Sequence, residues 1–236
     1  MGRAIACDFS PLTARNGGEI LAKLQIRRFV QRSEPVTVNC YLLSDPMSHE
    51  ALVIDPGGDA GRIVEALNSA GWRLKYIVLT HGHFDHTMCT AELACRTGAQ
   101  VCMSEKDLRF VYDSNLNAAN FAGAAPVAYF PVDIFLRDGD KLLLGQEALT
   151  VLETPGHTPG ELSLYFPGHL FCGDTILRGT TGRMDLPGAD PQLAAQVIAE
   201  KIFVLPDDTI LHCGHGMCSS VAYERANNNT IIKKGI

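Results

Sequence analysis

The stretch Tyr76-Ile77-Val78-Leu79-Thr80-His81-Gly82-His83-Phe84-Asp85-His86 determines more of the fold than any other part of this chain. It begins as a short apolar run, typical of a buried strand, and ends with three histidines and one aspartate. Buried together without a cation, these groups would repel one another or remain without partners. Imidazole and carboxylate groups bind zinc, and iron and manganese accept the same groups. We therefore predict a strand that ends in a metal site.

Three more candidate ligands stand alone, each beside glycine. His157 lies in Thr154-Pro-Gly-His-Thr-Pro-Gly, Asp174 in Cys172-Gly-Asp-Thr, and His215 in Gly214-His-Gly. Glycine allows tight turns and a close approach of the backbone to an ion. Each of these motifs, taken alone, is more often a turn or a cap than a ligand. Together with the dense cluster they give the candidate metal ligands His81, His83, Asp85, His86, His157, Asp174 and His215.

The spacing of these residues predicts two metal ions. His81 and His83, two apart in an extended segment, project to the same side and can bind one ion. The last two ligands of the cluster follow after the chain has begun to turn into a helix, so we expect them to bind a second ion nearby. The remaining ligands complete the arrangement, with His157 at the first ion, His215 at the second and Asp174 bridging. Two cations would stabilise a bridging hydroxide near neutral pH, and this nucleophile can attack a carbonyl.

Composition and charge restrict the class of protein. The 236 residues are 46% hydrophobic and 19% charged, which fits a globular protein with a substantial core. A net charge of −6 gives no basic field for nucleic acid or an anionic membrane. We find no export signal and no run near the roughly 20 apolar residues of a membrane span, so we expect a cytoplasmic protein. Its eight cysteines form no Cys-x-x-Cys pair, and we expect reduced, mostly buried thiols.

The order of elements predicts an α/β fold of four layers, αββα, with two mixed sheets face to face and helices outside. We expect residues 1–23 to be an N-terminal tail or edge element and residues 24–236 to form a single domain. Helices are expected between Asp59 and Gly71 and over 86–96, 105–111, 192–201 and 219–228. Strands are expected at 24–30, 36–43, 51–54, 74–80, 101–103, 141–144, 149–154, 162–166, 170–172 and 209–211. The uncharged segment 113–131 is either a functional rim or a structural loop.

Several further motifs resemble the metallo-β-lactamase superfamily, and within it the short bacterial hydrolases that are similar to glyoxalase II. They are Asn39-Cys-Tyr-Leu-Leu, Val53-Ile-Asp-Pro-Gly, Leu79-Thr-His-Gly-His, Thr154-Pro-Gly-His-Thr-Pro-Gly, Phe171-Cys-Gly-Asp-Thr, Gly182-Arg-Met-Asp-Leu-Pro-Gly, Asn115-Leu-Asn and Tyr223-Glu-Arg. The resemblance covers roughly residues 24–228. It implies an αββα fold, a dinuclear site and hydrolysis of a hydroxyacylglutathione-type thioester.

The resemblance also implies a role for each ligand. The first metal would be bound by His81, His83 and His157, the second by Asp85, His86 and His215, and both by Asp174. Asp85 would act in catalysis by orienting the nucleophile or accepting its proton. Zinc is the expected metal, with iron and manganese as alternatives. The expected partner is a small-molecule thioester such as S-lactoylglutathione, and the expected assembly is a monomer or a small homo-oligomer.

Three other functions are alternatives to thioester hydrolysis. A persulfide dioxygenase shares the motif but uses a single iron, held in a facial arrangement by imidazoles such as His83 and His157 together with Asp174. A catalytically idle binding module is disfavoured because no ligand is missing. A nucleic-acid hydrolase would need a further domain and a basic groove. The C-terminal helical domain with which glyoxalase II binds glutathione has no counterpart after His215, so the identity of the thiol is left open.

The remaining polar residues near these motifs are expected to be structural. We interpret Cys172 and Cys213 as small buried apolar residues rather than extra ligands. His212 is expected in the core, whereas His49 and His169 are expected in solvent-facing turns. The spacing of Arg183 and Asp185 predicts an ion pair that fixes the loop after Asp174.

Overall fold

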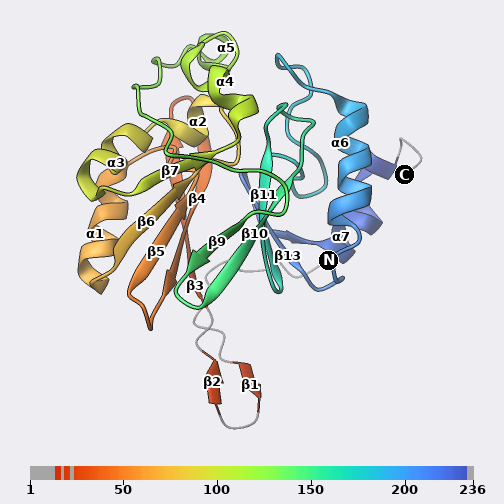
Figure 1. Cartoon of the computed structure of the whole chain (residues 1–236). Coiled ribbons are helices and arrows are strands. Elements are labelled where there is room, and N and C mark those ends of the chain that lie inside the picture. The colour runs from red at the N-terminus through yellow and green to blue at the C-terminus, as the bar shows by residue number, and fades with distance from the viewer. Residues whose placement is uncertain (1–13, 17–18, 22–23, 233–236) are drawn as a thin grey trace.

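Two mixed β-sheets lie face to face in the computed structural model, which describes residues 14–16, 19–21 and 24–232 (Figure 1). The first sheet has the spatial order β3 (Gln25–Ser33), β4 (Val36–Asp45), β5 (Glu50–Ile54), β6 (Arg73–Val78), β7 (Gln100–Met103) and β8 (Ile134–Phe135). The second has the order β14 (Ser219–Ser220), β13 (Ile210–Cys213), β12 (His169–Gly173), β11 (Leu162–Phe166), β10 (Glu147–Glu153) and β9 (Lys141–Leu144).

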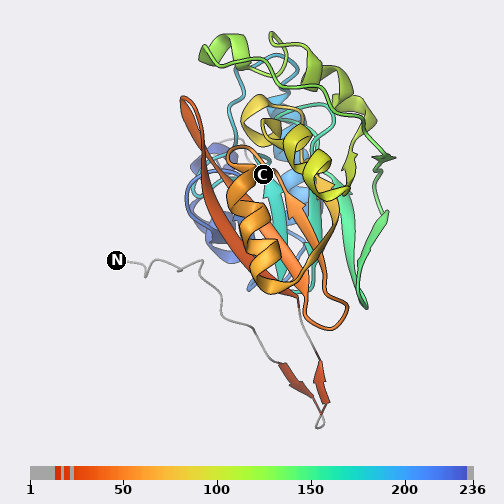
Figure 2. The ribbon, with the colours of Figure 1, turned by 90° about the vertical axis from the view of Figure 1, so that its left-hand side faces the viewer.

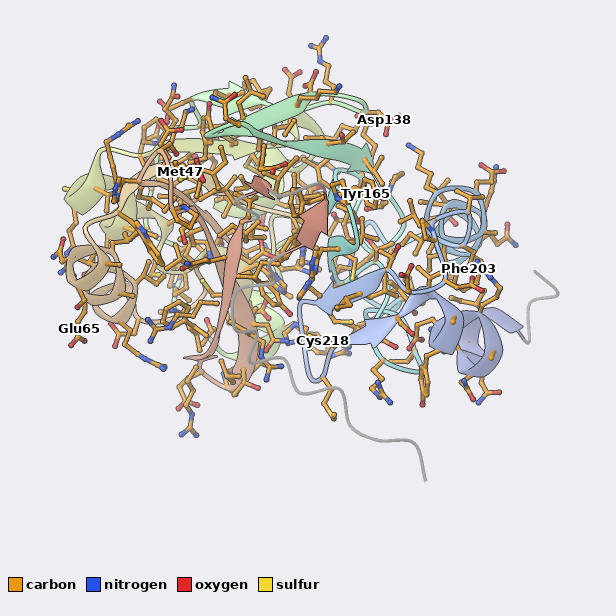
Figure 3. The ribbon with its side chains drawn as sticks, turned by 90° about the horizontal axis from the view of Figure 1, so that it is seen from below. Met47, Glu65, Asp138, Tyr165, Phe203 and Cys218 are labelled. Carbon is orange, nitrogen blue, oxygen red and sulfur yellow. The ribbon has the colours of Figure 1, made fainter. Side chains whose placement is uncertain are left out.

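Helices cover the outer face of each sheet. On the first sheet, α1 (Ala60–Ala70) and α3 (Thr90–Thr97) bury Ile63, Leu67 and Leu93 (Figure 2). On the second, α6 (Pro191–Val197), the π-helical turn Ile198–Ile202, α7 (Val221–Asn227) and α8 (Asn229–Ile232) supply the apolar cover. Seen from below, Glu65 on α1 and Phe203 after the π turn lie on opposite sides of the molecule, with the sheets between them (Figure 3). The four-layer αββα prediction is therefore confirmed.

The layer between the sheets is a continuous apolar core. Leu52, Ile54 and Val78 of the first sheet face Leu164 and Phe171 of the second, and each is at most 1% exposed. Alternation along each strand explains this, since every second side chain points to the same face. Burial of this apolar area is the main favourable contribution to folding.

The parallel strands bring polar loops to one edge. In the first sheet β5, β6 and β7 run parallel, with Val53 opposite Ile77 and Ile77 opposite Val101. In the second sheet β12 and β13 are parallel, with Leu170 opposite Leu211. The carboxyl ends of these strands, which the candidate ligands follow, therefore point to the same end of the molecule. The short helices α2 (Phe84–Thr87), α4 (Leu108–Tyr112) and α5 (Ala119–Ala122) lie at that end, at the top of Figure 1.

Most of the predicted elements are present, with a few differences. The predicted helix over 86–96 is divided into α2 and α3, because the backbone N–H of Cys89 donates to the carbonyl of Pro56 instead of continuing one helix. The two-residue strands β8 and β14 were missed, and the predicted loop 113–131 contains α5. The helix predicted over 219–228 begins only at Val221, because Ser219 and Ser220 pair with β13. The helix after Asp59 begins and ends as expected, with the Asp59 carboxylate accepting from Gly61 and Gly71 in the left-handed conformation.

Two expectations about single residues were wrong. His169 does not face solvent but begins β12 at 5% exposure, with its Nδ1 3.0 Å from Nε2 of His212. The turn before it is so short that His169 already pairs with Phe166 of β11. Cys218 is disulfide-bonded rather than a thiol, a pairing that depends on distances in the fold and not on sequence spacing. Cys40, Cys89, Cys95, Cys102, Cys172 and Cys213 are free as expected, and Cys7 lies outside the described residues.

Further predictions concerned two other histidines, the N-terminal segment and membrane-spanning helices. His49 is exposed in the turn after β4, and His212 is buried in the core, as predicted. Of the N-terminal segment 1–23, the structure describes β1 (Ala14–Asn16) and β2 (Glu19–Leu21), which pair with each other in a sheet of their own (Figure 2). The domain limits at residues 23 and 24 stay a prediction. No helix in the described part of the chain has the length and apolar character that crossing a bilayer requires.

The two neighbouring leucines of β9 test the position of the core. Leu144 is fully buried between the sheets, whereas Leu143 is 53% exposed. Leu144→Ala should lower the free energy of unfolding by about 2–5 kcal/mol, because it removes apolar contacts and leaves a cavity. Leu143→Ala should change it by less than about 0.5 kcal/mol. Urea denaturation measures both values, and equal losses would contradict this assignment of the core.

Candidate metal centre

The structure brings all seven candidate ligands together at the carboxyl ends of the strands. They reach this edge from four loops, which follow β6, β10, β12 and β13. Three groups of side chains there have nitrogen or oxygen atoms within 4.8 Å of one another. They are His81, His83 and His157; Asp85, His86 and His215; and His81, His86 and Asp174.

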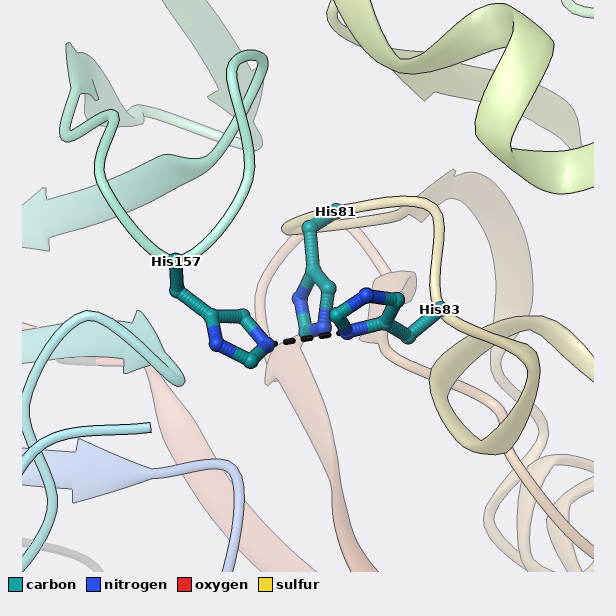
Figure 4. Close-up of side chains that lie close together, drawn as sticks. All are labelled: His81, His83 and His157. Atoms are coloured by element: carbon teal, nitrogen blue, oxygen red, sulfur yellow. Dashed lines mark hydrogen bonds between the residues drawn. The ribbon is translucent and has the colours of Figure 1, made fainter. Parts of the chain in front are cut away.

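The first group consists of three buried imidazoles. His81, His83 and His157 are 1%, 3% and 2% exposed and point toward one another from two loops (Figure 4). The Nε2 atom of His157 lies 2.9 Å from Nδ1 of His83, and the ring of His81 lies against both other rings. Burial lowers the pKa of His81 and His157, and it lowers the pKa of His83 to about 3. These rings are therefore neutral at pH 7, the state in which imidazole binds a metal.

The second group lies beside the first. Nε2 of His215 is 3.3 Å from Nε2 of His86 and 3.3 Å from Oδ2 of Asp85. Burial opposes charge on His215, yet Asp174 and then Asp85 raise its pKa to about 12. In the protein without metal, a proton on this ring therefore balances the charge of the two carboxylates. A divalent cation at the same place would supply that balance instead.

Asp174 lies between the two groups. Its Oδ2 is 3.6 Å from Nε2 of His157 and 3.3 Å from Nε2 of His215, and its Oδ1 is 3.7 Å from Nε2 of His86. Burial by itself would raise the pKa of this carboxyl, but His215 and His86 hold it well below its usual value. The ionised carboxylate therefore faces both sets of imidazoles, which is the position that the bridging prediction requires.

The outer nitrogens of three histidines fix which atoms face inward. Nδ1 of His86 donates to the Asp55 carboxylate at 2.9 Å, Nδ1 of His157 to the carbonyl of Arg183 at 2.8 Å, and Nδ1 of His215 to the carbonyl of Thr37 at 2.6 Å. In the neutral rings each Nε2 is then an unprotonated acceptor that points into the site. Acceptors that face one another at such distances repel unless a proton or a cation lies between them.

Buried atoms without partners lead to the same conclusion. Within the described residues, Nε2 of His81 and Oδ1 of Asp174 are buried and have no hydrogen-bond partner. Buried polar atoms are almost always satisfied, so such exceptions indicate a missing ligand. Together, the donor set, its charge state and these unpaired atoms fit divalent cations.

Two buried carboxylates outside the seven residues hold the loops in place. Asp55, after β5, accepts from the backbone N–H of Thr80 at 2.8 Å, from the Thr80 hydroxyl at 2.7 Å and from His86. Asp107 accepts from Gly82 at 2.9 Å, and also from Thr158 and Gly160 at 2.7 Å each, so it ties the His81–His86 loop to the His157 loop. Sequence reasoning assigned neither role. The Asp-Pro-Gly turn at a strand end was a signal for Asp55, whereas Asp107 had none.

Glu161 is a third buried carboxyl that the sequence did not indicate. Its Oε1 accepts from the backbone N–H of Asp174 at 2.7 Å and lies 3.9 Å from Nδ1 of His81. Burial, with the nearby Asp174 charge, raises the pKa of Glu161 well above its usual value. The hydrogen bond of this buried acid therefore fixes the backbone at Asp174.

Glycine is required where backbone segments approach the ligands. A Cβ atom at Gly57 would lie 1.6 Å from the carbonyl oxygen of Asp85. A Cβ atom at Gly214 would lie 2.4 Å from Oδ1 of Asp174 and 2.7 Å from Cε1 of His86. These glycines let the turn after β5 and the end of β13 come close to the site.

The neighbouring cysteines and the arginine take the structural positions that we predicted. Cys172 and Cys213 are fully buried, and neither belongs to a metal-type cluster within the described residues. The Cys213 sulfur lies 3.8 Å from the carbonyl of Leu211. Arg183 forms two hydrogen bonds with Asp185, at 2.9 and 2.6 Å, in the loop after Asp174.

The segment 113–131 forms one wall of a cavity above the ligands. The carbonyl of Asn117 accepts from the N–H of Phe84, and the Asn117 side chain donates to the carbonyl of Val111 and accepts from the N–H of Ala119. These hydrogen bonds hold α5 beside the candidate metal ligands. The cavity has a volume of about 280 Å³, and the ligands His83, Asp85, His157, Asp174 and His215 form its floor.

The protein family of this chain follows from comparison with known proteins. The profile of the metallo-beta-lactamase superfamily matches residues 33–215. The chain belongs to the metallo-beta-lactamase superfamily. It is 33% identical to the hydroxyacylglutathione hydrolase GloC of Haemophilus influenzae over 208 residues, which cover 85% of this chain and 97% of that protein. The resemblance to glyoxalase II is therefore confirmed, and the chain is a metallohydrolase.

Solved structures of similar proteins agree with this family assignment. The BLEG-1 B3 metallo-beta-lactamase has a TM-score of 0.82 at 30% identity and matches 88% of this chain and 99% of that one. TTHA1623 in a di-iron-bound form has a TM-score of 0.74 at 32% identity, with 85% and 98% covered. ETHE1 from Myxococcus xanthus has a TM-score of 0.73 at 25% identity, with 87% and 83% covered.

Two buried threonines provide a matched test of the Asp55 anchor. Thr80→Val removes the hydroxyl that donates to Asp55 and lies 3.0 Å from Nδ1 of His81, so it should destabilise the metal-free protein by about 1–3 kcal/mol. Thr90 is fully buried, and its hydroxyl has no partner among the described residues, so Thr90→Val should be neutral or stabilising. Urea denaturation of both variants checks this. Equal effects would show that the Thr80 hydroxyl does not support the site.

Proposed function

We propose that this metallohydrolase binds two divalent cations and cleaves a thioester such as S-lactoylglutathione or a related hydroxyacyl thioester. The observation that carries the proposal is the carboxylate of Asp174, which lies within 3.7 Å of imidazole nitrogens from both ligand groups. A single ion would leave one group of facing acceptors without a partner. The similarity to hydroxyacylglutathione hydrolases supports the choice of a thioester.

Each ligand would keep the place that the geometry gives it. His81, His83 and His157 would hold one cation, and Asp85, His86 and His215 the other, with Asp174 shared between them. When bound, such cations activate water as a nucleophile and polarise the carbonyl of a substrate. Zinc is our proposed metal, although the similar TTHA1623 was solved with two irons.

Asp85 is the proposed catalytic side chain. It is 7% exposed, and it lines the cavity above the ligands, so it can reach both water and substrate there. Burial opposes its charge, but His86 and then His215 lower its pKa, so the carboxylate is ionised near neutral pH and can accept a hydrogen bond or a proton. The thiolate leaving group needs no strong acid, and the cavity contains none among its described lining residues.

A second candidate is a mononuclear iron persulfide dioxygenase. The similarity to ETHE1 supports it, and Nε2 of His157 lies 2.9 Å from Nδ1 of His83 and 3.6 Å from Oδ2 of Asp174, three groups that a facial iron site could use. It leaves Asp85 and His215 without a metal, although Nε2 of His215 lies only 3.3 Å from Oδ2 of Asp85. We therefore place it second.

Metal analysis together with turnover separates the two candidates. Purified protein should contain two metal ions per chain by inductively coupled plasma mass spectrometry. It should also release glutathione thiol from S-lactoylglutathione, as detected with a thiol reagent. One iron per chain with oxygen uptake on glutathione persulfide would replace the proposal by the dioxygenase.

Asp174→Ala tests the shared carboxylate. The variant should lose bound metal and lower kcat/KM by more than about 100-fold, because both ligand groups lose an oxygen. Cys213→Ala is the matched control two residues from His215, and it should keep both metal content and kcat. Loss of metal from the Cys213 variant would show that this sulfur is a ligand.

The proposal also covers the substrate class, the cellular location, the oligomeric state and the partners of the enzyme. A small-molecule substrate follows from the similarity to hydrolases of small thioesters. We propose a cytoplasmic enzyme that is a monomer or a small homo-oligomer and has no nucleic-acid partner. Cell fractionation and sedimentation analysis would test these points.

A further inference from the structure

The walls of the cavity above the ligands are apolar. Apart from the ligands, the lining comes mainly from Val36, Phe121, Ala122, Leu177 and Leu186. An apolar cluster of Phe84, Ala118 and Ala119 packs against Val36, Ala122 and Leu186 of this wall, so water beside the wall meets few polar partners. Apolar walls of this kind gain free energy when an apolar group of a ligand displaces water.

Phe121 is the most unusual residue of the wall. Its side chain is 66% exposed, although it is large and apolar. It projects from α5, which the backbone and side-chain bonds of Asn117 fix in place. The guanidinium of Arg183 lies 4.6 Å from the centre of its ring. The ring is therefore placed at the rim by its helix and by the Arg183 guanidinium, where it can cover an apolar ligand.

Charge in the cavity does not suit glutathione. Arg183 is the one lysine or arginine side chain among the described lining residues. Its guanidinium already forms a bidentate ion pair with Asp185 and stacks on Phe121. Glutathione carries two carboxylates, and recognition of such groups ordinarily uses unpaired arginine or lysine. The lining therefore offers little specific binding to the thiol part of a glutathione thioester.

Size limits what the cavity can enclose. A volume of about 280 Å³ is slightly below the 300–1,000 Å³ that is usual for ligand pockets. One short half of a thioester fits such a space, but a whole glutathione conjugate does not. When the thioester carbonyl lies over the candidate metal ligands, one half of the substrate contacts the apolar wall. That half is the one that the cavity encloses.

We propose that this site selects thioesters by a short apolar acyl chain, which binds against Phe121, Leu177 and Leu186, and that the thiol half adds little to recognition. The inference rests on the proposed thioester hydrolysis and narrows its substrate class. In the reaction water forms a C–O bond to the acyl carbon, the C–S bond breaks, and the products are a carboxylic acid and a free thiol. The segment 113–131 is then the specificity wall of the site.

Four thioesters test the proposal on the metal-loaded enzyme. They combine two acyl groups, lactoyl and hexanoyl, with two thiols, glutathione and the uncharged N-acetylcysteamine. In both thiol series kcat/KM for hexanoyl should exceed that for lactoyl by about tenfold or more, because additional methylenes enter the apolar cavity. Exchange of the thiol should change kcat/KM by less than that.

Two aromatic residues of the same segment give a matched pair of variants. Phe121→Ala should reduce the hexanoyl preference by about fivefold or more, since it removes the wall. Tyr129 is 75% exposed and lies outside the cavity lining, so Tyr129→Ala should keep the preference of the parent enzyme. Both residues are largely exposed, so neither variant is expected to unfold the protein.

Clear outcomes would overturn the inference. A lactoyl substrate that equals or exceeds its hexanoyl counterpart, or a glutathione series more than tenfold better than the uncharged series, would exclude apolar selection. If none of the four thioesters is cleaved, thioester hydrolysis itself is wrong. The cavity is then tested by calorimetry with two uncleavable thioethers, S-hexyl- and S-methyl-N-acetylcysteamine. Tighter binding of the hexyl compound, lost in Phe121→Ala, supports an apolar binding site, and equal binding refutes it.

Discussion

The hydrogen bonds of one buried carboxylate, Asp55, support the rest of the site. Asp55 is 2% exposed, and it accepts from the backbone and hydroxyl of Thr80 and from the ring of His86. The Thr80 hydroxyl in turn contacts His81, so one carboxyl group at the end of β5 orients imidazoles of both candidate ligand groups. A carboxyl group buried in this position is stable only because several donors satisfy it. The same bonds fix which ring nitrogens face the interior.

A small number of hydrogen bonds also joins the two halves of the chain. Asp107 joins the loop after β6 to the loop after β10, and Asn39 and Tyr41 of β4 donate to the carbonyl of Cys213 at the end of β13. These contacts lie at the edge where the apolar core between the sheets ends. The core supplies most of the stability, whereas the polar contacts decide how the loops align.

The sequence was sufficient for the general architecture and for the seven candidate ligands that the structure brings together. Alternating apolar runs and helix caps, such as Asp59 with Gly71, predicted most of the strands and helices, because these signals are local. The break between α2 and α3 escaped prediction, since it depends on a bond from Cys89 to a distant turn. His169 was misplaced for the same reason, because its burial depends on strands that pair around it. Local patterns do not contain such partners.

The sequence by itself determined which chemical groups are available, because it places three histidines and one aspartate within the six residues His81–His86. It also determined the strand that delivers His81 and His83. Only the tertiary structure decided that His157, Asp174 and His215 converge on that strand, that Asp55 and Asp107 hold them, and that Phe121 walls the cavity. The physical reason is that ligand geometry and cavity shape arise from contacts between segments far apart in the chain. Sequence spacing measures distance along the backbone, and it does not measure these contacts.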